Sequence, residues 1–260
     1  MSVSLTDLRP HFQVDQVVEG KSHFYDVTEK GVTERFPGVT GVLGVINKPA
    51  LVPWAKKEAL NSVEGALLKR LGDKGIAKIL LDREWIRTIL QEASKRPQQV
   101  KEDAADLGTQ AHAAIDLIVR GQEPPEIPDL IKAPVDAFRQ WWKYSGIEIV
   151  LGDTKVASRQ YRYGGSLDAL GRRGGRYVIL DWKTSSGLYS EYALQVAAYA
   201  QAFYETFGEP CTDAIVVRFG KKLPIEFEKK TVADLRLSLR AFLAAKELKE
   251  LLEQPHFENW

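Results

Sequence analysis

The chain has 260 residues, of which 44% are hydrophobic and 10% aromatic. A chain of this length and composition can bury a large apolar core, which excludes intrinsic disorder as its main state. The 36 basic and 35 acidic residues leave a net charge of +1, so no overall field draws the chain to nucleic acid or to an anionic membrane. Binding of either kind would need a local patch.

Cysteine usage and the N-terminus indicate the compartment. The single cysteine, Cys211, excludes an internal disulfide framework and a four-cysteine zinc or iron–sulfur site. The first residues carry charges and lack the apolar run of a secretory signal, and no apolar stretch approaches the roughly 18 residues of a membrane span. We therefore expect a cytoplasmic protein with no membrane partner.

The N-terminal half is expected to form a hairpin followed by helices. Aromatic and β-branched residues alternate around the turn-forming Lys30-Gly31 pair, which predicts a hairpin over residues 22–36. After this hairpin leucine and alanine recur at helical spacing, and Pro97 is expected to end the helical region. Further helices are expected over residues 98–119 and 129–144.

The pattern changes to strands after Gly146. Residues 147–185 read as three successive strands, and Gly174-Gly175 predicts a tight hairpin between the last two. A helix over residues 190–207, two short strands and a last helix from about residue 233 follow. The order predicts an α/β fold with a mixed central β-sheet flanked by helices. In it, residues 1–97 would form an N-terminal hairpin and helical cap, and residues 98–260 the core.

Asp181 and Lys183 lie at the end of an apolar predicted strand. Residues two apart in a strand point to the same face, so the carboxylate and the ammonium can share one site. There the carboxylate could hold a hard divalent cation, and the lysine could position a water or stabilise negative charge. The alternative is an ordinary ion pair at the end of a strand.

Asp168 lies on the preceding predicted strand, between Leu167 and Ala169. Burying a carboxylate there is costly unless it is paired or binds a metal. The hairpin would bring Asp168 beside Asp181, and two close carboxylates repel each other unless a cation lies between them. This favours a metal site, although Asp168 could also be a turn or strand-edge residue.

Two helical pairs accompany these strand residues. His112 and Asp116 are four residues apart in one predicted helix, and Gln195 and Tyr199 are four apart in another, so each pair shares a helix face. A lone helical histidine is more often a capping or core residue than a metal ligand. Gln195 and Tyr199 alone would be the polar edge of an amphipathic helix.

In this order, the pieces resemble the PD-(D/E)XK nuclease superfamily, in its RecB-like exonuclease branch. The resemblance lies in Gly108-x-x-x-His112, Gly165-x-x-Asp168, Asp181-x-Lys183 and Gln195-x-x-x-Tyr199. An upstream stretch is similar to the start of phage and mitochondrial genome-maintenance exonucleases, at Pro37, Val39, Thr40, Leu51 and Trp54.

The resemblance implies a restriction-endonuclease-like core that hydrolyses DNA phosphodiester bonds with Mg²⁺ or Mn²⁺ and has no iron–sulfur cluster. It implies that Asp168, Asp181 and Lys183 are catalytic, with Lys183 orienting or activating the attacking water. It implies metal ligation by His112, Asp168, Asp181 and the main-chain carbonyl of Trp182. Gln195 and Tyr199 would line the substrate side of the site, and Thr184 and Ser185 would lie near the backbone phosphates.

Two positions depart from the family pattern. Asp116 stands where the family often has glutamate, and the acidic residue often present on the first strand is at best Asp153. The resemblance therefore assigns no role to these two residues.

Local charge also favours DNA binding. Residues 155–176 contain six basic residues against one acidic residue, Asp168, a net charge of +5. Arg159, Arg172 and Arg173 could contact phosphates without reading sequence, and Tyr161, Tyr163 and Tyr189 could stack on unpaired bases. The alternative is a solvated basic hairpin.

These observations lead us to expect an exonuclease that acts on single-stranded or unwinding DNA ends in replication, recombination or repair. Replication or recombination proteins are possible partners, and a phage protein that acts in the host cytoplasm fits equally well. The alternatives are a structure-specific endonuclease of the same superfamily and a catalytically silent DNA-binding module. The complete set of Asp168, Asp181 and Lys183 argues against a silent module.

Overall fold

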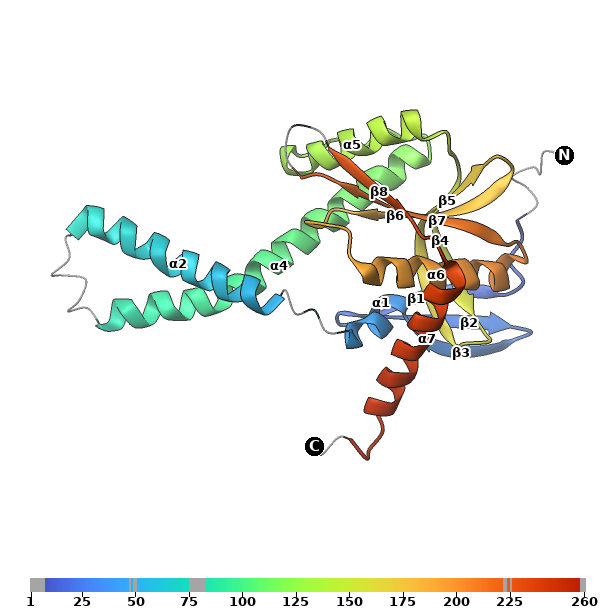
Figure 1. Ribbon diagram of the computed structural model, residues 1–260, viewed down its shortest axis with the longest axis horizontal. Helices are drawn as coiled ribbons and strands as arrows, with labels where there is room; N and C mark the ends of the chain where they lie inside the picture. The colour runs from blue at the N-terminus through green and yellow to red at the C-terminus, as the bar shows by residue number, and fades with distance from the viewer. Residues whose placement is uncertain are drawn as a thin grey trace. The chain divides into compact units, whose positions relative to one another are not determined.

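The computed structural model (Figure 1) describes residues 8–46, 48, 51–74, 83–221, 224 and 226–257, with the backbone alone for residues 72–74. The chain divides into two compact units, one of residues 1–46 and 110–260 and the other of residues 47–109. Within the described ranges, no helix combines the length and apolarity that crossing a bilayer requires.

The N-terminal strands form a small antiparallel sheet in the order β1-β2-β3. Lys30 and Gly31 join β2 to β3 with φ values of 50° and 82°, and such turns match the twist of two paired strands. The predicted hairpin is confirmed, and β1 adds a strand to it. The bounds are β1 (Gln13–Glu19), β2 (Ser22–Glu29) and β3 (Val32–Pro37).

The helical region that follows is less interrupted than expected. It consists of α1 (Val39–Val42), the 3₁₀ turn η2 (Leu43–Val45), α2 (Leu51–Lys74) and α4 (Arg83–Val119). The expectation that Pro97 ends a helix is wrong, because Pro97 lies inside α4. A proline removes one helical hydrogen bond at a cost of about 3 kcal/mol. Buried residues on both sides of it, such as Ala93 and Ile115, stabilise the continuous helix.

The main sheet has five strands in the order β4-β5-β6-β7-β8. Only β6 and β7 pair in parallel, and α6 (Ser190–Phe207) connects them; the remaining neighbours are antiparallel. The predicted α/β fold with a mixed sheet flanked by helices is confirmed. The bounds are β4 (Glu148–Ser158), β5 (Tyr163–Arg173), β6 (Arg176–Lys183), β7 (Cys211–Phe219) and β8 (Phe227–Thr231).

Helices cover both faces of this sheet (Figure 1). On one face, Ile179 and Val216 belong to the same core cluster as Phe203 of α6, and α6 also packs with α7 (Leu235–Leu252). On the other face, the Trp182 ring packs edge-on against Phe138 and Trp141 of α5 (Asp129–Ser145). Because successive side chains alternate along β6, Asp181 and Lys183 lie on the α6 face, opposite Trp182.

Candidate active site

The hairpin of β5 and β6 brings two carboxylates together. Ala169 pairs with Leu180 and Leu170 with Ile179, so the antiparallel register continues to Asp168 opposite Asp181. The Trp182 N–H donates a hydrogen bond of 2.6 Å to Asp168 Oδ2. Gly174 and Gly175 make this register possible, because both adopt the positive φ values of a tight turn, 56° and 78°.

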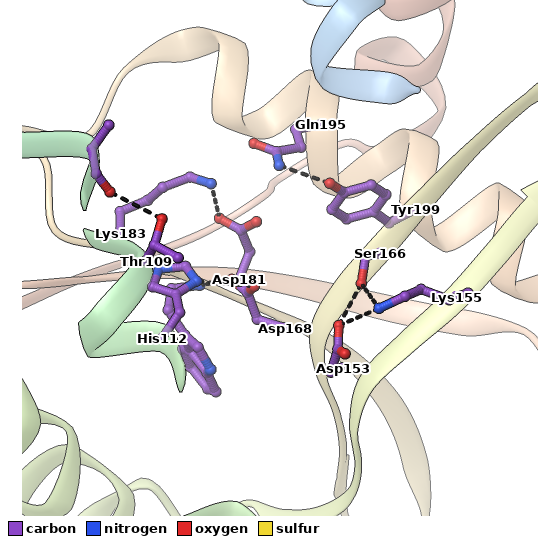
Figure 2. Close-up of polar contacts among 12 residues, drawn as sticks. Thr109, His112, Asp153, Lys155, Ser166, Asp168, Asp181, Lys183, Gln195 and Tyr199 are labelled. Carbon is purple, nitrogen blue, oxygen red and sulfur yellow. Dashed lines mark hydrogen bonds and ion pairs between the residues drawn. The ribbon is translucent and has the colours of Figure 1, made fainter. Parts of the chain in front are cut away.

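Asp181 is buried beside Lys183. The side chains are 2% and 17% exposed, and Lys183 Nζ lies 2.7 Å from Asp181 Oδ2 (Figure 2). The pairing is an ion pair only, because Oδ2 makes no aligned hydrogen bond with any described residue. Burial raises the pKa of Asp181 to about 6, and the neighbouring Asp168 adds to the rise while Lys183 opposes it.

The ammonium of Lys183 is stabilised in its charged form. Burial alone would lower the pKa of Lys183, but the charges of Asp181 and Asp168 outweigh it and raise this pKa above its ordinary value. At neutral pH Lys183 is therefore a hydrogen-bond donor and a positive charge. It can orient a water or stabilise an anion, but it cannot accept a proton.

His112 reaches the same cluster from α4. Its Nδ1 lies 3.3 Å from Asp168 Oδ1, and Figure 2 shows His112 beside the two aspartates. Burial would lower the pKa of His112, yet the Asp168 carboxylate raises it overall. Burial likewise acts to raise the pKa of Asp168, but His112, Lys183 and the Trp182 N–H lower it overall. Asp168 is thus the carboxylate whose ionised form is favoured, and Asp181 is the one that is costlier to ionise.

Gln195 and Tyr199 lie on the face of α6 that borders this cluster (Figure 2). Both are buried, and Gln195 Nε2 donates a hydrogen bond of 2.9 Å to the Tyr199 hydroxyl. Burial, with the nearby charge of Asp181, raises the pKa of Tyr199 well above its ordinary value. The hydroxyl therefore keeps its proton and remains available as a donor.

Gly165 allows Tyr199 to approach β5. A Cβ atom at this position would lie 2.3 Å from Tyr199 Cε1, and the ring is 4% exposed, so it has little room to move. We expect Gly165→Ala to lower the free energy of unfolding by about 1–3 kcal/mol through overpacking. Chemical denaturation of the metal-free protein measures this loss. Gly41→Ala is the matched control, because nothing lies within 4 Å of a Cβ there; equal stability of both variants would contradict the prediction.

Asp153 and Asp116 belong to separate contacts. Asp153 Oδ1 accepts bonds from Lys155 Nζ at 2.5 Å and from Ser166 Oγ at 2.7 Å, and Figure 2 shows this network apart from the Asp168–Asp181 pair. Asp116 Oδ2 pairs with Arg120 at 2.9 Å. Its Oδ1 is buried and makes no hydrogen bond with the described part of the chain.

The loop after β6 holds the other two predicted substrate-binding residues. Thr184, directly after Lys183, is half-buried, and Ser185 Oγ donates a hydrogen bond of 2.7 Å to the Gly187 carbonyl. Sequence reasoning missed Tyr192, whose ring centre lies 4.8 Å from Lys183 Nζ. Its signal was the spacing of 192, 195 and 199, which places Tyr192, Gln195 and Tyr199 on one helix face.

The three predicted phosphate-binding arginines are all ion-paired. Arg159 pairs with Glu29, Arg172 with Glu148 at 3.0 Å, and Arg173 with Asp213 at 3.3 Å. Arg159 precedes β5 and the other two end it, so the two ends of this 11-residue strand are roughly 33 Å apart at a rise of about 3.3 Å per residue. The net charge of +5 counted along residues 155–176 is therefore divided between two ends and offset by acids from other elements.

The donor set suits a hard divalent cation. Carboxylate oxygens are the ligands that Mg²⁺ prefers, and Asp181 Oδ2 is a buried oxygen without an aligned hydrogen bond. Across the described ranges, however, no three histidine, cysteine, aspartate or glutamate side chains are grouped so that they could hold a metal ion. His112 and the Trp182 N–H engage Asp168 while Lys183 engages Asp181, so a cation would have to displace some of these contacts.

Comparison with known proteins gives only distant similarities. No protein-family model matches the sequence, and no curated protein matches it. Among solved structures, a protein called SSO0001 is 16% identical with a TM-score of 0.35, over 65% of this chain and 71% of that one. The alkaline exonuclease LHK-Exo from Laribacter hongkongensis is 15% identical with a TM-score of 0.27, over 58% of this chain and 88% of that one. The similarity to a nuclease is thus weak, and the site itself must carry any functional conclusion.

Proposed function

We propose that the protein is a metal-dependent DNA exonuclease of the PD-(D/E)XK superfamily, in its RecB-like branch, with residues 98–260 as its nuclease core. One observation carries the proposal. Asp168, Asp181 and Lys183 from two neighbouring strands meet His112 from α4 in one cluster. A buried carboxylate beside a second, partly buried one, close to the Lys183 ammonium and to His112, is costly in an ordinary core and suits a site that binds a cation and an anion together.

The residues have distinct roles in this proposal. Asp168, Asp181, His112 and the Trp182 carbonyl hold Mg²⁺ or Mn²⁺, which polarises the phosphodiester when bound. The Lys183 ammonium donates to the attacking water or to the oxygen on which negative charge develops. Gln195 and the protonated Tyr199 hydroxyl line the side of the site where the DNA strand binds. Thr184 and Ser185, in the loop after β6, lie near the phosphates of that DNA strand.

Comparing linear DNA with closed circular DNA tests whether cleavage requires a free end, as an exonuclease does. End-labelled linear single-stranded DNA and a closed circle of the same sequence are incubated with the protein and Mg²⁺, beside a linear RNA of that sequence. We expect the linear DNA to be degraded progressively from an end, whose label reports the polarity, while the circle stays intact. Cleavage of the circle would indicate the alternative, a structure-specific endonuclease. A result in which all three substrates remain intact would exclude both nucleases.

Metal affinity should rise with pH. A cation competes with protons for its ligands, and the pKa of Asp181 is about 6 while that of His112 is raised above its usual value. Both groups are increasingly deprotonated between pH 6 and pH 8, so the Mg²⁺ concentration that gives half-maximal cleavage should fall over this range. Titrations of Mg²⁺ at fixed DNA concentration and at several pH values measure this half-maximal concentration. A half-maximal concentration that stays constant from pH 6 to pH 8 would remove both residues from the ligand set.

We also propose that three arginines bind DNA phosphates: Arg159, Arg172 and Arg173. Each of them forms an ion pair with a carboxylate in the structure. Each guanidinium must exchange a carboxylate for a phosphate, so the net gain per contact is smaller than for a free arginine. Their contribution should therefore appear mainly in the dependence of DNA affinity on salt. The proposed partners are DNA ends and replication or recombination proteins.

A further inference from the structure

A pocket of about 460 Å³ opens beside the candidate active site. It is formed by the loop and first turn of α6, by β7 and β8, and by the start of α7. Its lining combines apolar side chains, two tyrosines and one lysine; those that matter below are Tyr189, Tyr192, Val216 and Lys230. Of these four residues, the sequence singles out Tyr189 alone, as a candidate for stacking on unpaired bases, and none of them holds the metal or the attacking water in the proposed reaction.

The strand register places this pocket on the face that carries Asp181. Asp181 pairs with Val216 across β6 and β7, and Val216 pairs with Lys230 across β7 and β8. Paired residues on neighbouring strands point to the same face, so the three side chains form one row. With about 4.8 Å between strands, Lys230 lies about 10 Å from Asp181 along the sheet. A nucleotide next to one bound at Asp181 can span that distance.

Tyr192 connects the candidate active site with the pocket. Its ring centre lies 4.8 Å from Lys183 Nζ, and the same ring lines the pocket. Tyr189 packs against it edge-on, with ring centroids 5.6 Å apart and an interplanar angle of 71°. The Tyr189 hydroxyl is within 2.7 Å of Ser186 Oγ, yet the residue is 45% exposed. Tyr189 is thus an aromatic ring that is held in place and still accessible from solvent.

The pocket lining contains one basic residue, Lys230, and one acidic residue, Asp234. Its acidic residue, Asp234, is engaged as the N-cap of α7, where Oδ1 accepts from the Leu237 N–H at 2.9 Å. Lys230 is exposed, and within the described residues no carboxylate lies in ion-pair contact with it. A fixed aromatic ring, apolar walls and an available ammonium suit a flat base attached to a phosphate.

We propose that this pocket binds an unpaired nucleobase of the strand whose phosphate lies at Asp181 and Lys183, with the base on Tyr189 and an adjacent phosphate near Lys230. The inference rests on the proposed nuclease function and extends it to strand selection. A base held in a duplex cannot enter a pocket lined by side chains, so the pocket favours single-stranded DNA. Stacking recognises any base through its flat face, so the selection is for unpaired strands and not for sequence.

The test measures KM for Mg²⁺-dependent cleavage of a fluorescently labelled single-stranded oligothymidylate. Tyr189→Leu removes the ring and keeps a comparable apolar bulk, and Tyr189→Phe keeps the ring. Tyr144→Leu, at an exposed tyrosine of α5 that lies outside the pocket lining, is the control. A second substrate series carries one abasic nucleotide, moved stepwise through the positions nearest the digested end.

We expect Tyr189→Leu to raise KM roughly tenfold or more, while Tyr189→Phe and Tyr144→Leu stay near the wild-type value. An abasic nucleotide should raise the wild-type KM at one position in particular, and Tyr189→Leu should lose that dependence on position. If the wild-type protein cleaves the strand but Tyr189→Leu matches it in both series, the pocket assignment is overturned and the proposed function stands. If the wild-type protein cleaves no nucleic acid, both are overturned.

Discussion

Lys183→Ala should reduce turnover by about 10² or more while DNA binding survives. The ammonium is kept charged by Asp181 and Asp168, so its loss removes a fixed donor from the position where negative charge develops, and such losses cost about 10²–10³ in kcat. The rate should stay low at any Mg²⁺ concentration, because a cation can balance the carboxylates but cannot donate that hydrogen bond.

Saturating kinetics separate this role from simple charge balance. Single-turnover rates are measured with DNA and Mg²⁺ both saturating, and DNA affinity is measured separately. Lys155→Ala is the matched control, since it removes a lysine whose partner, Asp153, lies in another network. Recovery of the Lys183→Ala rate at high Mg²⁺ would show that the lysine only balances charge, and a rate near wild type under saturation would refute a catalytic role.

Asp181→Asn and Asp168→Asn should both abolish Mg²⁺-dependent cleavage but shift the stability of the metal-free protein in opposite directions. The folded protein raises the pKa of Asp181 to about 6, so ionising this buried group destabilises the fold above the pKa of the unfolded chain. Asp181→Asn should thus be more stable, on the order of 2–3 kcal/mol near pH 8. The gain should shrink as the pH falls from about 6 to about 4.

Asp168→Asn has the reverse sign. The folded protein lowers the pKa of Asp168 through His112, Lys183 and the Trp182 N–H, so its ionised form contributes stability that is present at neutral pH and lost on acidification. Melting temperatures in chelator at several pH values measure both effects. Asp136→Asn on α5, which removes a surface ion pair with Lys132, is the control. Equal losses of stability in both site variants would contradict the opposite pKa shifts of the two carboxylates.

Local signals in the sequence predicted the elements that hold the site. Lys30-Gly31 and Gly174-Gly175 predicted two hairpins, and both pairs adopt positive φ. The tight turn of the second hairpin sets the register of β5 and β6, and this register leads to Asp168 opposite Asp181. The proximity of the two carboxylates could therefore be predicted from the turn and from the alternation of side chains. Pro97 misled because a proline signals a helix break on average, whereas tertiary packing can maintain a helix through it.

Contacts between segments that lie far apart in the chain could not be predicted from the sequence. The charge of residues 155–176 looked available because Glu29, Glu148 and Asp213 lie far away along the chain. The engagement of Asp168 by His112 and the pocket beside Tyr192 also depend on how separate elements pack. Side-chain spacing identifies residues on one face, but it does not show which partners have already neutralised them.

The central claim is that Asp168, Asp181, Lys183 and His112 form a metal-dependent phosphodiesterase site. The most direct measurement is cleavage of end-labelled linear DNA by the purified protein in Mg²⁺, in excess EDTA, and after Mg²⁺ is restored, with Asp181→Asn beside the wild type. We predict that the wild type cleaves in Mg²⁺, stops in EDTA and recovers when Mg²⁺ returns, whereas Asp181→Asn is inactive throughout. Undiminished cleavage by the wild type in EDTA, or wild-type cleavage by Asp181→Asn, would contradict the assignment.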